Sequence, residues 1–187
     1  ELRGNVRVFA RVRPFLPSDG VGPEEVPAVV GKGDGVGCVV SKRLVGDDGK
    51  ELAPEVQSFS FDKCFPPSAG QEEVFTEVSE FVQSALDGFN VCLFSYGQTG
   101  SGKTHTMQGS GAGDMRGMIP RAMEQARMRT RRSLEQAQGW EYEMQVSFLE
   151  IYNEQIRDLL RDEGSKDVKH EIKRDPRGNT TVTDLTL

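Results

Sequence analysis

The chain has 187 residues, of which 28% are charged, and a formal net charge of -6 at pH 7. Its length suffices for one domain with a buried core, and the absence of any run of 18 apolar residues excludes a membrane-spanning helix. The acidic balance argues against a nucleic-acid binder, because such proteins usually carry a basic surplus. Three dispersed cysteines, Cys38, Cys64 and Cys92, predict reduced, buried thiols in a cytosolic or nuclear protein.

The N-terminal segment alternates between β-rich stretches and loops. Apolar residues at every second position from 6 to 12 predict a strand with one buried face, which Pro14 ends. Residues 15–37 are rich in glycine, proline and charge, and predict an exposed loop. The next expected elements are a short strand over 36–41, a turn over 46–49 that leads to a partner strand, and a further strand from Phe59 to about Phe65.

The segment after Pro66 and Pro67 predicts the clearest helix of the chain. Ser68 and Gln71 have the spacing of a capping box, and Gly88 stands where a C-terminal cap belongs. Apolar residues recur between them at helical spacing: Val74, Phe75, Val78, Phe81, Val82, Ala85 and Leu86. We expect this stripe to pack on a sheet that contains residues 91–96.

Residues 90–104 predict an apolar strand that runs directly into a phosphate-binding loop. Gly97-Gln-Thr-Gly-Ser-Gly-Lys-Thr104 matches the pattern Gly-x-x-x-x-Gly-Lys-Thr in full. Glycine and small residues let the backbone form a cradle of N–H groups around a phosphate chain. Lys103 then supplies a positive charge, and Thr104 a hydroxyl for Mg²⁺. We expect a helix to begin near Gly102 with its free N–H groups facing the same anion.

Two segments of opposite character follow the phosphate loop. Residues 109–117 are too rich in glycine for regular structure and predict a mobile loop close to the nucleotide. Pro120 suits the first turn of a helix that reaches to about Gln138. This helix carries arginines that form either a solvated face or a partner-binding patch: Arg121, Arg127, Arg129, Arg131 and Arg132.

The C-terminal part is expected to be mostly β-structure. Alternating apolar residues predict a long strand over 140–148, and Asn153 is expected to cap a short helical segment over 156–160. A final hairpin is expected to join strands over 168–173 and 180–187 through Asp175-Pro-Arg-Gly178, which has the residue order of a type I turn.

The chain shows only half of a hydrolytic site. Hydrolysis also needs an acid that helps to hold Mg²⁺, usually an Asp after a buried strand, and groups that position water. Three Asp-x-x-Gly matches begin at Asp19, Asp34 and Asp175, but polar, glycine or proline residues precede each of them, so we interpret them as turns. The two histidines, His105 and His170, form no cluster with Cys or carboxylates at metal-ligand spacing.

Five motifs, in this order, resemble the N-terminal half of a kinesin motor domain. They are Arg11-Val-Arg-Pro14, Phe59-Ser-Phe-Asp62 with Gln71, Val74 and Phe75, Tyr96 to Met107, Gly117-Met-Ile-Pro-Arg121, and Leu149 to Leu160. The resemblance covers nearly the whole chain. It implies an α/β fold of the P-loop NTPase, kinesin-type motor class, with a central mixed β-sheet flanked by helices and incomplete on its C-terminal side.

The resemblance also implies roles for matching residues. Arg11, Arg13, Pro14 and His105 would contact adenine, although a solvated side chain remains an alternative for His105. ATP or ADP and Mg²⁺ would be held by Gln98, Thr99, Gly100, Ser101, Gly102, Lys103 and Thr104, with Thr104 as the metal ligand. The hairpin at 173–177 resembles a loop that touches β-tubulin, and an ordinary solvated turn fits it nearly as well. No catalytic residue is assigned.

Residues 1–9 and 81–92 resemble the kinesin-14 group, in which a minus-end-directed motor stands at the C-terminus. This similarity implies that residues 1–5 end a neck, that residues 6–187 are the N-terminal part of one motor domain truncated before its switch segments, and that a coiled-coil stalk outside the chain makes a homodimer. Microtubules are the implied partner, with no nucleic acid and no membrane. The implied location is the cytoplasm and its microtubule cytoskeleton, including the spindle.

The two switch motifs of the family, Asn-x-x-Ser-Ser-Arg-Ser-His and Asp-Leu-Ala-Gly-Ser-Glu, do not occur in these residues. The expected function is the ATP-binding part of a motor that couples ATP hydrolysis to movement along microtubules, with little turnover by this chain alone. One alternative is a non-hydrolysing module that binds nucleotide or tubulin as a tether or regulator. An unrelated phosphate-loop kinase is a remote third option, because small kinases usually carry the loop in their first strand and helix.

Overall fold

The structure, a computed structural model, describes residues 6–22, 24–136, 141–162, 168–176 and 178–187. The expected neck at 1–5, Trp140 and Arg177 lie outside these residues, and so does the side chain of Arg132. The chain divides into two parts, Glu1–Ser133 and Leu134–Leu187. No described helix combines the length and the apolar character that crossing a membrane requires. The expectation of a single domain over 6–187 stays a prediction.

Strand β1 (Phe9–Arg11) confirms the first predicted strand in a shorter form. It pairs in parallel with β5 (Lys63–Phe65), and the Val12 N–H donates to the Phe65 carbonyl at 2.9 Å. The Phe9 and Phe65 rings meet edge to face with centroids 6.3 Å apart. Because Phe65 is fully buried, this pair anchors β1 in the core.

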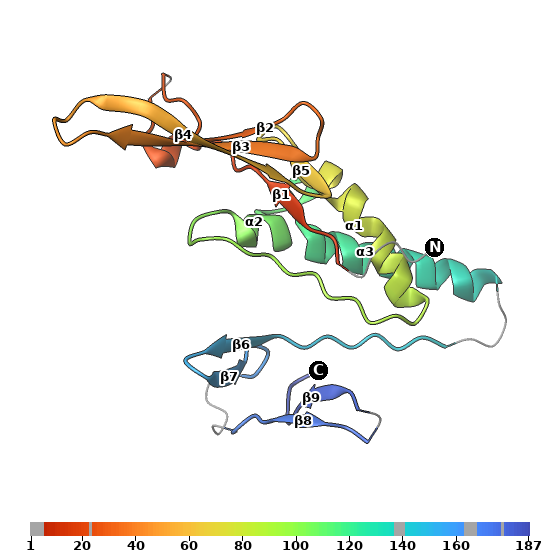
Figure 1. The fold of residues 1–187 in the computed structure, drawn as a ribbon. Coiled ribbons are helices and arrows are strands. Elements are labelled where there is room, and N and C mark those ends of the chain that lie inside the picture. Colours follow the sequence, from red (N-terminus) through yellow and green to blue (C-terminus); the bar gives the residue numbers. More distant parts are fainter. Residues whose placement is uncertain (1–5, 23, 137–140, 163–167, 177) are drawn as a thin grey trace. The chain divides into compact units, whose positions relative to one another are not determined.

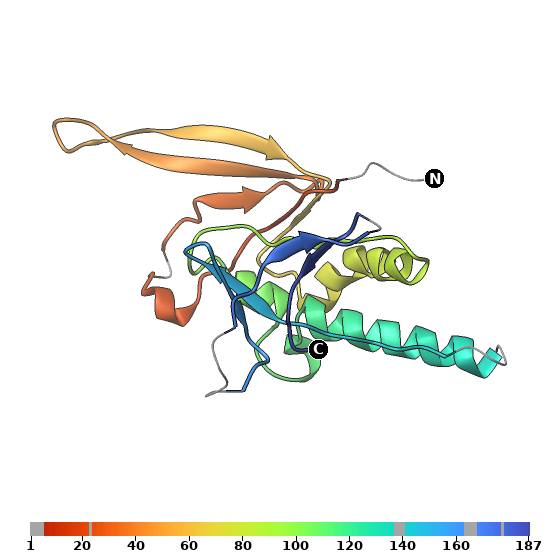
Figure 2. The same ribbon diagram turned by 90° about the horizontal axis from the view of Figure 1, so that it is seen from below.

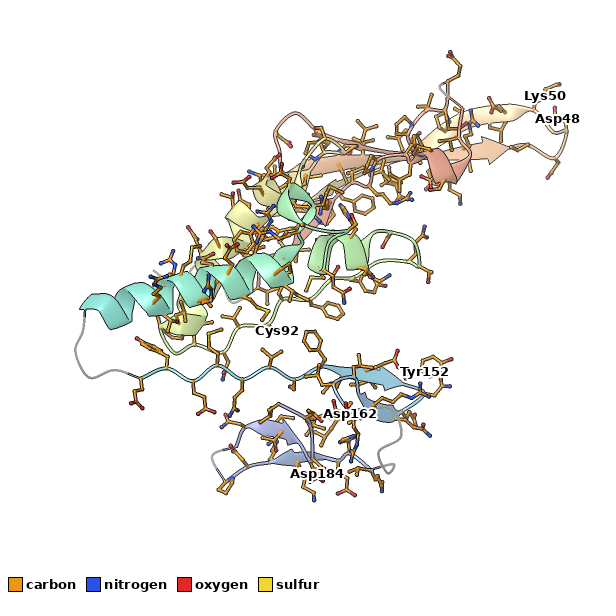
Figure 3. The ribbon with its side chains drawn as sticks, turned by 180° about the vertical axis from the view of Figure 1, so that it is seen from behind. Asp48, Lys50, Cys92, Tyr152, Asp162 and Asp184 are labelled. Atoms are coloured by element: carbon orange, nitrogen blue, oxygen red, sulfur yellow. The ribbon has the colours of Figure 1, made fainter. Side chains whose placement is uncertain are left out.

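Strands β2 (Val29–Gly31), β3 (Gly37–Val45) and β4 (Glu51–Ser60) form an antiparallel sheet in the order β2-β3-β4. The predicted turn at 46–49 is confirmed, since the Gly46 N–H donates to the Lys50 carbonyl at 2.8 Å. Asp48 and Lys50 mark the tip of this hairpin, which projects beyond the helices (Figures 1 and 3). β2 lies within the stretch predicted to be a loop, 15–37, and the single strand predicted from Phe59 to about Phe65 is instead divided between the end of β4 and β5.

Helix α1 (Gln71–Leu86) confirms the predicted helix. Its C-terminal cap is also confirmed: Gly88 has a φ of 98°, and its N–H donates to the Ala85 carbonyl at 3.1 Å. The predicted capping box is wrong, because the N-cap is Gly70 and no side chain caps the helix start. Gln71 is the first helical residue, and its amide points into the protein instead.

The core of the first part gathers around Phe65. Buried Val74 and Val78 of α1 pack there with Ala69 and with Met118. Met118 begins α3 (Met118–Gln136), which confirms the helix predicted around Pro120. Helices α1 and α3 lie side by side (Figures 1 and 2), and hydrogen bonds join them, including one from Arg129 to Gln83.

Residues 89–96 run from α1 to α2 (Lys103–Met107) without strand pairing (Figure 1). The strand predicted here is therefore wrong for this structure. Phe94 and Tyr96 are 80% and 91% exposed. Apolar residues favour a strand, but a strand forms only where a neighbouring segment provides partners for its backbone hydrogen bonds. The stripe of α1 accordingly packs around Phe65 and not on a sheet formed by 91–96.

The glycine-rich segment 109–117 is more regular than the sequence predicts. Gly109 and Arg116 form an isolated β-bridge around the 3-10 turn η2 (Gly113–Met115). The Gly117 N–H donates to the Gln108 carbonyl at 3.0 Å and closes the segment. Arg121 of α3 donates to the carbonyls of Asp114 and Arg116. At least this arginine of the predicted run therefore stabilises the segment 109–117.

The second part contains two hairpins. Strands β6 (Leu149–Tyr152) and β7 (Gln155–Asp158) pair directly across Asn153 and Glu154, both of which have positive φ. The predicted helical segment after Asn153 is therefore wrong, and so is the long strand before β6, because residues 141–148 carry no strand.

Strands β8 (Ile172–Arg174) and β9 (Thr180–Val182) confirm the last predicted hairpin, although both strands are shorter than expected. The Gly178 N–H donates to the Asp175 carbonyl at 2.9 Å and closes the predicted turn. The tubulin contact expected for residues 173–177 stays a prediction.

Candidate nucleotide site

The phosphate loop occupies residues 97–102, directly before α2. The Ser101 N–H donates to the Gln98 carbonyl at 3.1 Å, which folds the loop back on itself. Gly102 is the N-cap of α2, with a φ of 97°, and its carbonyl accepts the first intrahelical bond from the Thr106 N–H at 2.9 Å. The prediction that a helix begins near Gly102 is confirmed.

Lys103 spans the loop from within. Its Nζ atom donates to the carbonyls of Gly97 and Gln98, both at 2.8 Å. An ammonium group carries three donors, so a third N–H exists beyond these two bonds. These bonds hold the positive charge of Lys103 against the backbone of the loop.

Most of the remaining loop residues are exposed to solvent, so a ligand could reach them. Gln98, Thr99, Gly100 and Thr104 are exposed, and Ser101 is half-buried. Mg²⁺ is commonly held by one or two protein groups together with phosphate oxygens, so the exposed Thr104 hydroxyl fits that need. Within the described ranges, no group of three or more His, Cys, Asp or Glu side chains could hold a metal.

Arg13 lies beside the phosphate loop. A Cβ atom built on Gly102 would stand 4.0 Å from Cδ of Arg13. The guanidinium forms a two-pronged ion pair with Asp19, in which both nitrogen–oxygen distances are 2.8 Å. The bonds from Arg13 and from the Leu16 N–H hold the pKa of Asp19 below its ordinary value. Pro14 follows Arg13 at the surface, and the adenine contacts of both stay predictions.

Arg11 turns toward the interior. Its Nη1 atom donates to Gln71 Oε1 at 2.7 Å and to Thr106 Oγ1 at 3.0 Å, and Nη2 donates to the Ala69 carbonyl at 3.2 Å. Burial lowers the pKa of Arg11, while the charge of Glu73 acts in the opposite direction. The expected adenine contact stays a prediction, and these bonds favour a role in holding α2.

The two histidines have separate surroundings. His105 is half-buried on α2, with Nδ1 3.4 Å from Ser110 Oγ, and thus borders the segment 109–117. His170 belongs to the second part, where its Nδ1 lies 2.8 Å from the Thr183 carbonyl. Of the predicted adenine contacts, His105 thus lies on α2, Arg11 bonds to Thr106 of the same helix, and Arg13 lies beside Gly102.

Three residues of this site were not assigned a place in it by the sequence analysis: Asp19, Gln71 and Thr106. The sequence predicts a turn at Asp19 and a helix-capping role for Gln71. Only the tertiary structure shows that Asp19 orients Arg13 and that Gln71 and Thr106 accept hydrogen bonds from Arg11. The one sequence signal for Gln71 was its place among the resembling motifs.

Comparisons with known proteins agree with this geometry. Residues 11–187 match the family model of the kinesin motor domain. The chain is 49% identical to kinesin-like protein KIN-14N of Oryza sativa subsp. japonica, over 100% of this chain and 23% of that protein. It is 48% identical to carboxy-terminal kinesin 2 of Xenopus laevis, over 93% of this chain and 27% of that protein.

Solved structures show the same relationship. The motor domain of the Kar3-like kinesin from Ashbya gossypii matches with a TM-score of 0.75 and 39% identity, over 98% of this chain and 53% of that one. The C-terminal motor domain of Kar3 from Candida glabrata matches with a TM-score of 0.70 and 34% identity, over 97% of this chain and 55% of that one. The chain thus spans about a quarter of the curated relatives and about half of these motor domains. By its family match and by these similarities, the chain belongs to the kinesin motor domain family, with the kinesin-type P-loop NTPase fold.

Proposed function

We propose that the chain is the nucleotide-binding part of a motor that couples ATP hydrolysis to movement along microtubules. The observation that carries this proposal is the loop 97–104, in which the Lys103 ammonium lies within 2.8 Å of two loop carbonyls. A fixed cation inside a curved, glycine-rich backbone suits the β- and γ-phosphates of ATP. Thr104 would supply a hydroxyl ligand to Mg²⁺.

The flanking residues supply an adenine end. Arg13 stands beside Gly102, and His105 lies on the helix that follows the loop. A guanidinium plane and an imidazole ring can both stack on a purine. We propose that these two side chains, together with Pro14, border the base. Arg11 would support them through its hydrogen bond to Thr106 of α2.

The wider assembly is proposed from family membership. Microtubules would be the track, and a coiled-coil stalk outside these residues would join two motors. The place of action would be the cytoskeleton of the cytoplasm, including the spindle. In such motors, contacts with the γ-phosphate order switch loops and so change affinity for the track.

A titration with a fluorescent ADP analogue in the presence of Mg²⁺ tests the nucleotide site. We expect Lys103→Ala to weaken binding about 10- to 100-fold, because it removes a charged hydrogen-bond donor to phosphate. Lys50→Ala, at the exposed tip of the β3–β4 hairpin, is the matched control with the same change in charge. Equal affinity in the two variants would refute the proposed site.

Turnover is a separate measurement. We expect microtubules to produce little ATP hydrolysis by these 187 residues above the level of Lys103→Ala, because the residues that would position water are not among them. Strong stimulation by microtubules would contradict this expectation. The alternative of a nucleotide-binding tether or regulator also predicts little turnover by these residues, so the two hypotheses are separated by whether the two switch motifs follow Leu187 in the transcript.

A further inference from the structure

We propose that Gln71 is a positioning residue of the nucleotide site, whose buried amide and its partner Arg11 hold helix α2 in register so that Lys103, Thr104 and His105 face the nucleotide. This inference rests on the proposed function and deepens it. Gln71 lies outside the phosphate loop, in the first turn of α1. Its effect on the ligand would act entirely through α2.

The Gln71 side chain joins three separate segments. The residue is only 4% exposed. Its Oε1 atom accepts from Arg11 of β1 at 2.7 Å, and its Nε2 atom donates to the His105 carbonyl of α2 at 2.6 Å. The same Nε2 atom reaches the Met115 carbonyl of the segment 109–117 at 3.5 Å. A buried amide with both ends engaged fixes the positions of its partners, because each lost bond would leave a buried polar group unsatisfied.

The His105 carbonyl needs this partner because of how α2 ends. In a continuing helix, the Gly109 N–H would donate to the His105 carbonyl. Here the N–H groups of Gln108 and Gly109 both donate to the Thr104 carbonyl, at 2.8 and 3.1 Å. The last carbonyls of a helix must find hydrogen-bond donors outside the helix backbone, and the Gln71 amide supplies one for the His105 carbonyl.

Arg11 forms the second arm of the network. Its guanidinium binds the Gln71 oxygen and the Thr106 hydroxyl together, so α2 is held at two successive residues, His105 and Thr106. The three oxygens that accept these bonds from Arg11 are neutral. Since β1 is anchored in the core through Phe9 and Phe65, the network ties α2 to a rigid frame.

The length of α2 makes such support necessary. The helix has five residues, and isolated helices of fewer than about 12 residues are marginal in water. Its position must therefore come from tertiary contacts. Lys103, Thr104 and His105 all belong to this one short helix, so a shift of α2 would move the phosphate, metal and adenine contacts as a unit.

Two substitutions separate positioning from packing. Gln71→Met keeps the size of the side chain but removes both polar ends. Gln71→Glu keeps the acceptor for Arg11 and loses the donor to His105, which a protonated carboxyl restores as the pH falls. Gln155→Glu, an exposed glutamine of β7, is the matched control for the change in charge.

The first readout needs no nucleotide. We expect amide hydrogen exchange in α2 and in 109–117 to rise about tenfold in Gln71→Met, with α1 beyond its first turn unchanged. The second readout is the affinity for Mg·ADP at a temperature where thermal melting shows every variant to be folded. We expect about tenfold weaker binding by Gln71→Met and by Gln71→Glu at pH 8, since both variants lose the hydrogen bond to the His105 carbonyl.

The pH profile distinguishes a positioning role from a merely structural one. Because the Arg11 guanidinium favours the ionised form of the carboxyl that Gln71→Glu introduces, the affinity of this variant, relative to wild type, should stay low from pH 8 to about pH 5 and recover only below about pH 4, whereas that of Gln71→Met should not recover. Wild-type exchange in α2 together with wild-type ADP affinity in folded Gln71→Met would overturn the inference. If wild type itself binds no ADP, the proposed function fails, and the exchange comparison still decides whether Gln71 holds α2.

Two substitutions of Thr106 provide a second test, which applies even if Gln71→Met does not fold. Thr106→Val removes the acceptor for Arg11 at nearly constant shape, and Thr106→Ser retains a hydroxyl. We expect Thr106→Val to weaken ADP binding and to speed exchange in α2 more than Thr106→Ser does. Equal behaviour of the two variants would overturn the part of the inference that assigns Arg11 to α2.

Discussion

At the scale of single residues, the start of helix α2 depends on the backbone conformation of Gly102. Its φ of 97° lies in the left-handed region, which costs other residues about 1–2 kcal/mol. The glycine allows the chain to turn from the loop into α2 within one residue. It therefore sets the direction in which Lys103 and Thr104 leave the loop.

We expect Gly102→Ala to lower the free energy of unfolding by about 1–2 kcal/mol, measured by urea denaturation. The strain would come from the backbone, because the new Cβ meets only Arg13 Cδ, at 4.0 Å. Gly33→Ala is the control: it has no positive φ and open space around it, so a change within about 0.5 kcal/mol is expected. Equal effects at both positions would contradict the backbone explanation.

The ion pair between Arg13 and Asp19 predicts an acid-sensitive contact. Because the folded-state pKa of Asp19 is depressed, the pair favours the fold above the unfolded pKa and loses that contribution as the pH falls through the folded pKa. This window lies below about pH 4. We expect Arg13→Gln to raise the Asp19 midpoint in a carbon NMR titration. An unchanged midpoint would show that the Leu16 N–H alone depresses it.

At the scale of elements, the stability of a short hairpin depends on the backbone conformation of its turn residues. The hairpin β6–β7 turns through Asn153 and Glu154, with φ of 48° and 61°. Two successive positive φ values are typical of a type I′ turn, for which Asn-Gly is the preferred pair. Asn153 suits its position, and Glu154 bears the strain of a left-handed conformation without the freedom of glycine.

We expect Glu154→Gly to stabilise the β6–β7 hairpin by about 0.5–1 kcal/mol, because glycine adopts this conformation without steric cost. Increased protection of the β6 and β7 amides from hydrogen exchange would measure the gain. Asn153→Val should have the opposite effect, since a β-branched residue resists a positive φ. A loss of protection in Glu154→Gly would contradict the assigned turn.

At the scale of the whole molecule, the thiols report which regions are covered. Cys38 and Cys64 are buried, as predicted, but Cys92 is exposed on the run between α1 and α2, which corrects the expectation for that residue (Figure 3). Burial, and secondly the nearby Cys38 thiol, raise the pKa of Cys64. The exposure of Cys92 follows from the missing strand pairing over 89–96.

We expect iodoacetamide to modify Cys92 in the folded protein. Modification of Cys38 and Cys64 should be slower by a factor of at least about 100. The buried thiols react only after an opening that costs about 3 kcal/mol or more. Peptide mapping by mass spectrometry would identify the modified residue, and Cys92→Ser should abolish the fast phase. Rapid modification of Cys64 would contradict a closed core around Phe65.

Elements whose determinants are local were predictable. Helix α1 follows from its apolar spacing and from Gly88, the turn at 46–49 from its glycines and aspartates, and the phosphate loop from its residue order. Strands with distant partners were not. β2 exists because β3 pairs with it, and 91–96 is not a strand because no described neighbour bonds to it.

The sequence by itself determined the family and the phosphate loop, because these depend on residue type and spacing, while the residues that would meet a nucleotide stay a prediction. Only the tertiary structure decided the roles of Gln71 and Arg11. Their bonds connect β1, α1 and α2, residues up to 95 positions apart in the chain. No local pattern encodes such a contact, since it exists only after the core has brought the three elements together.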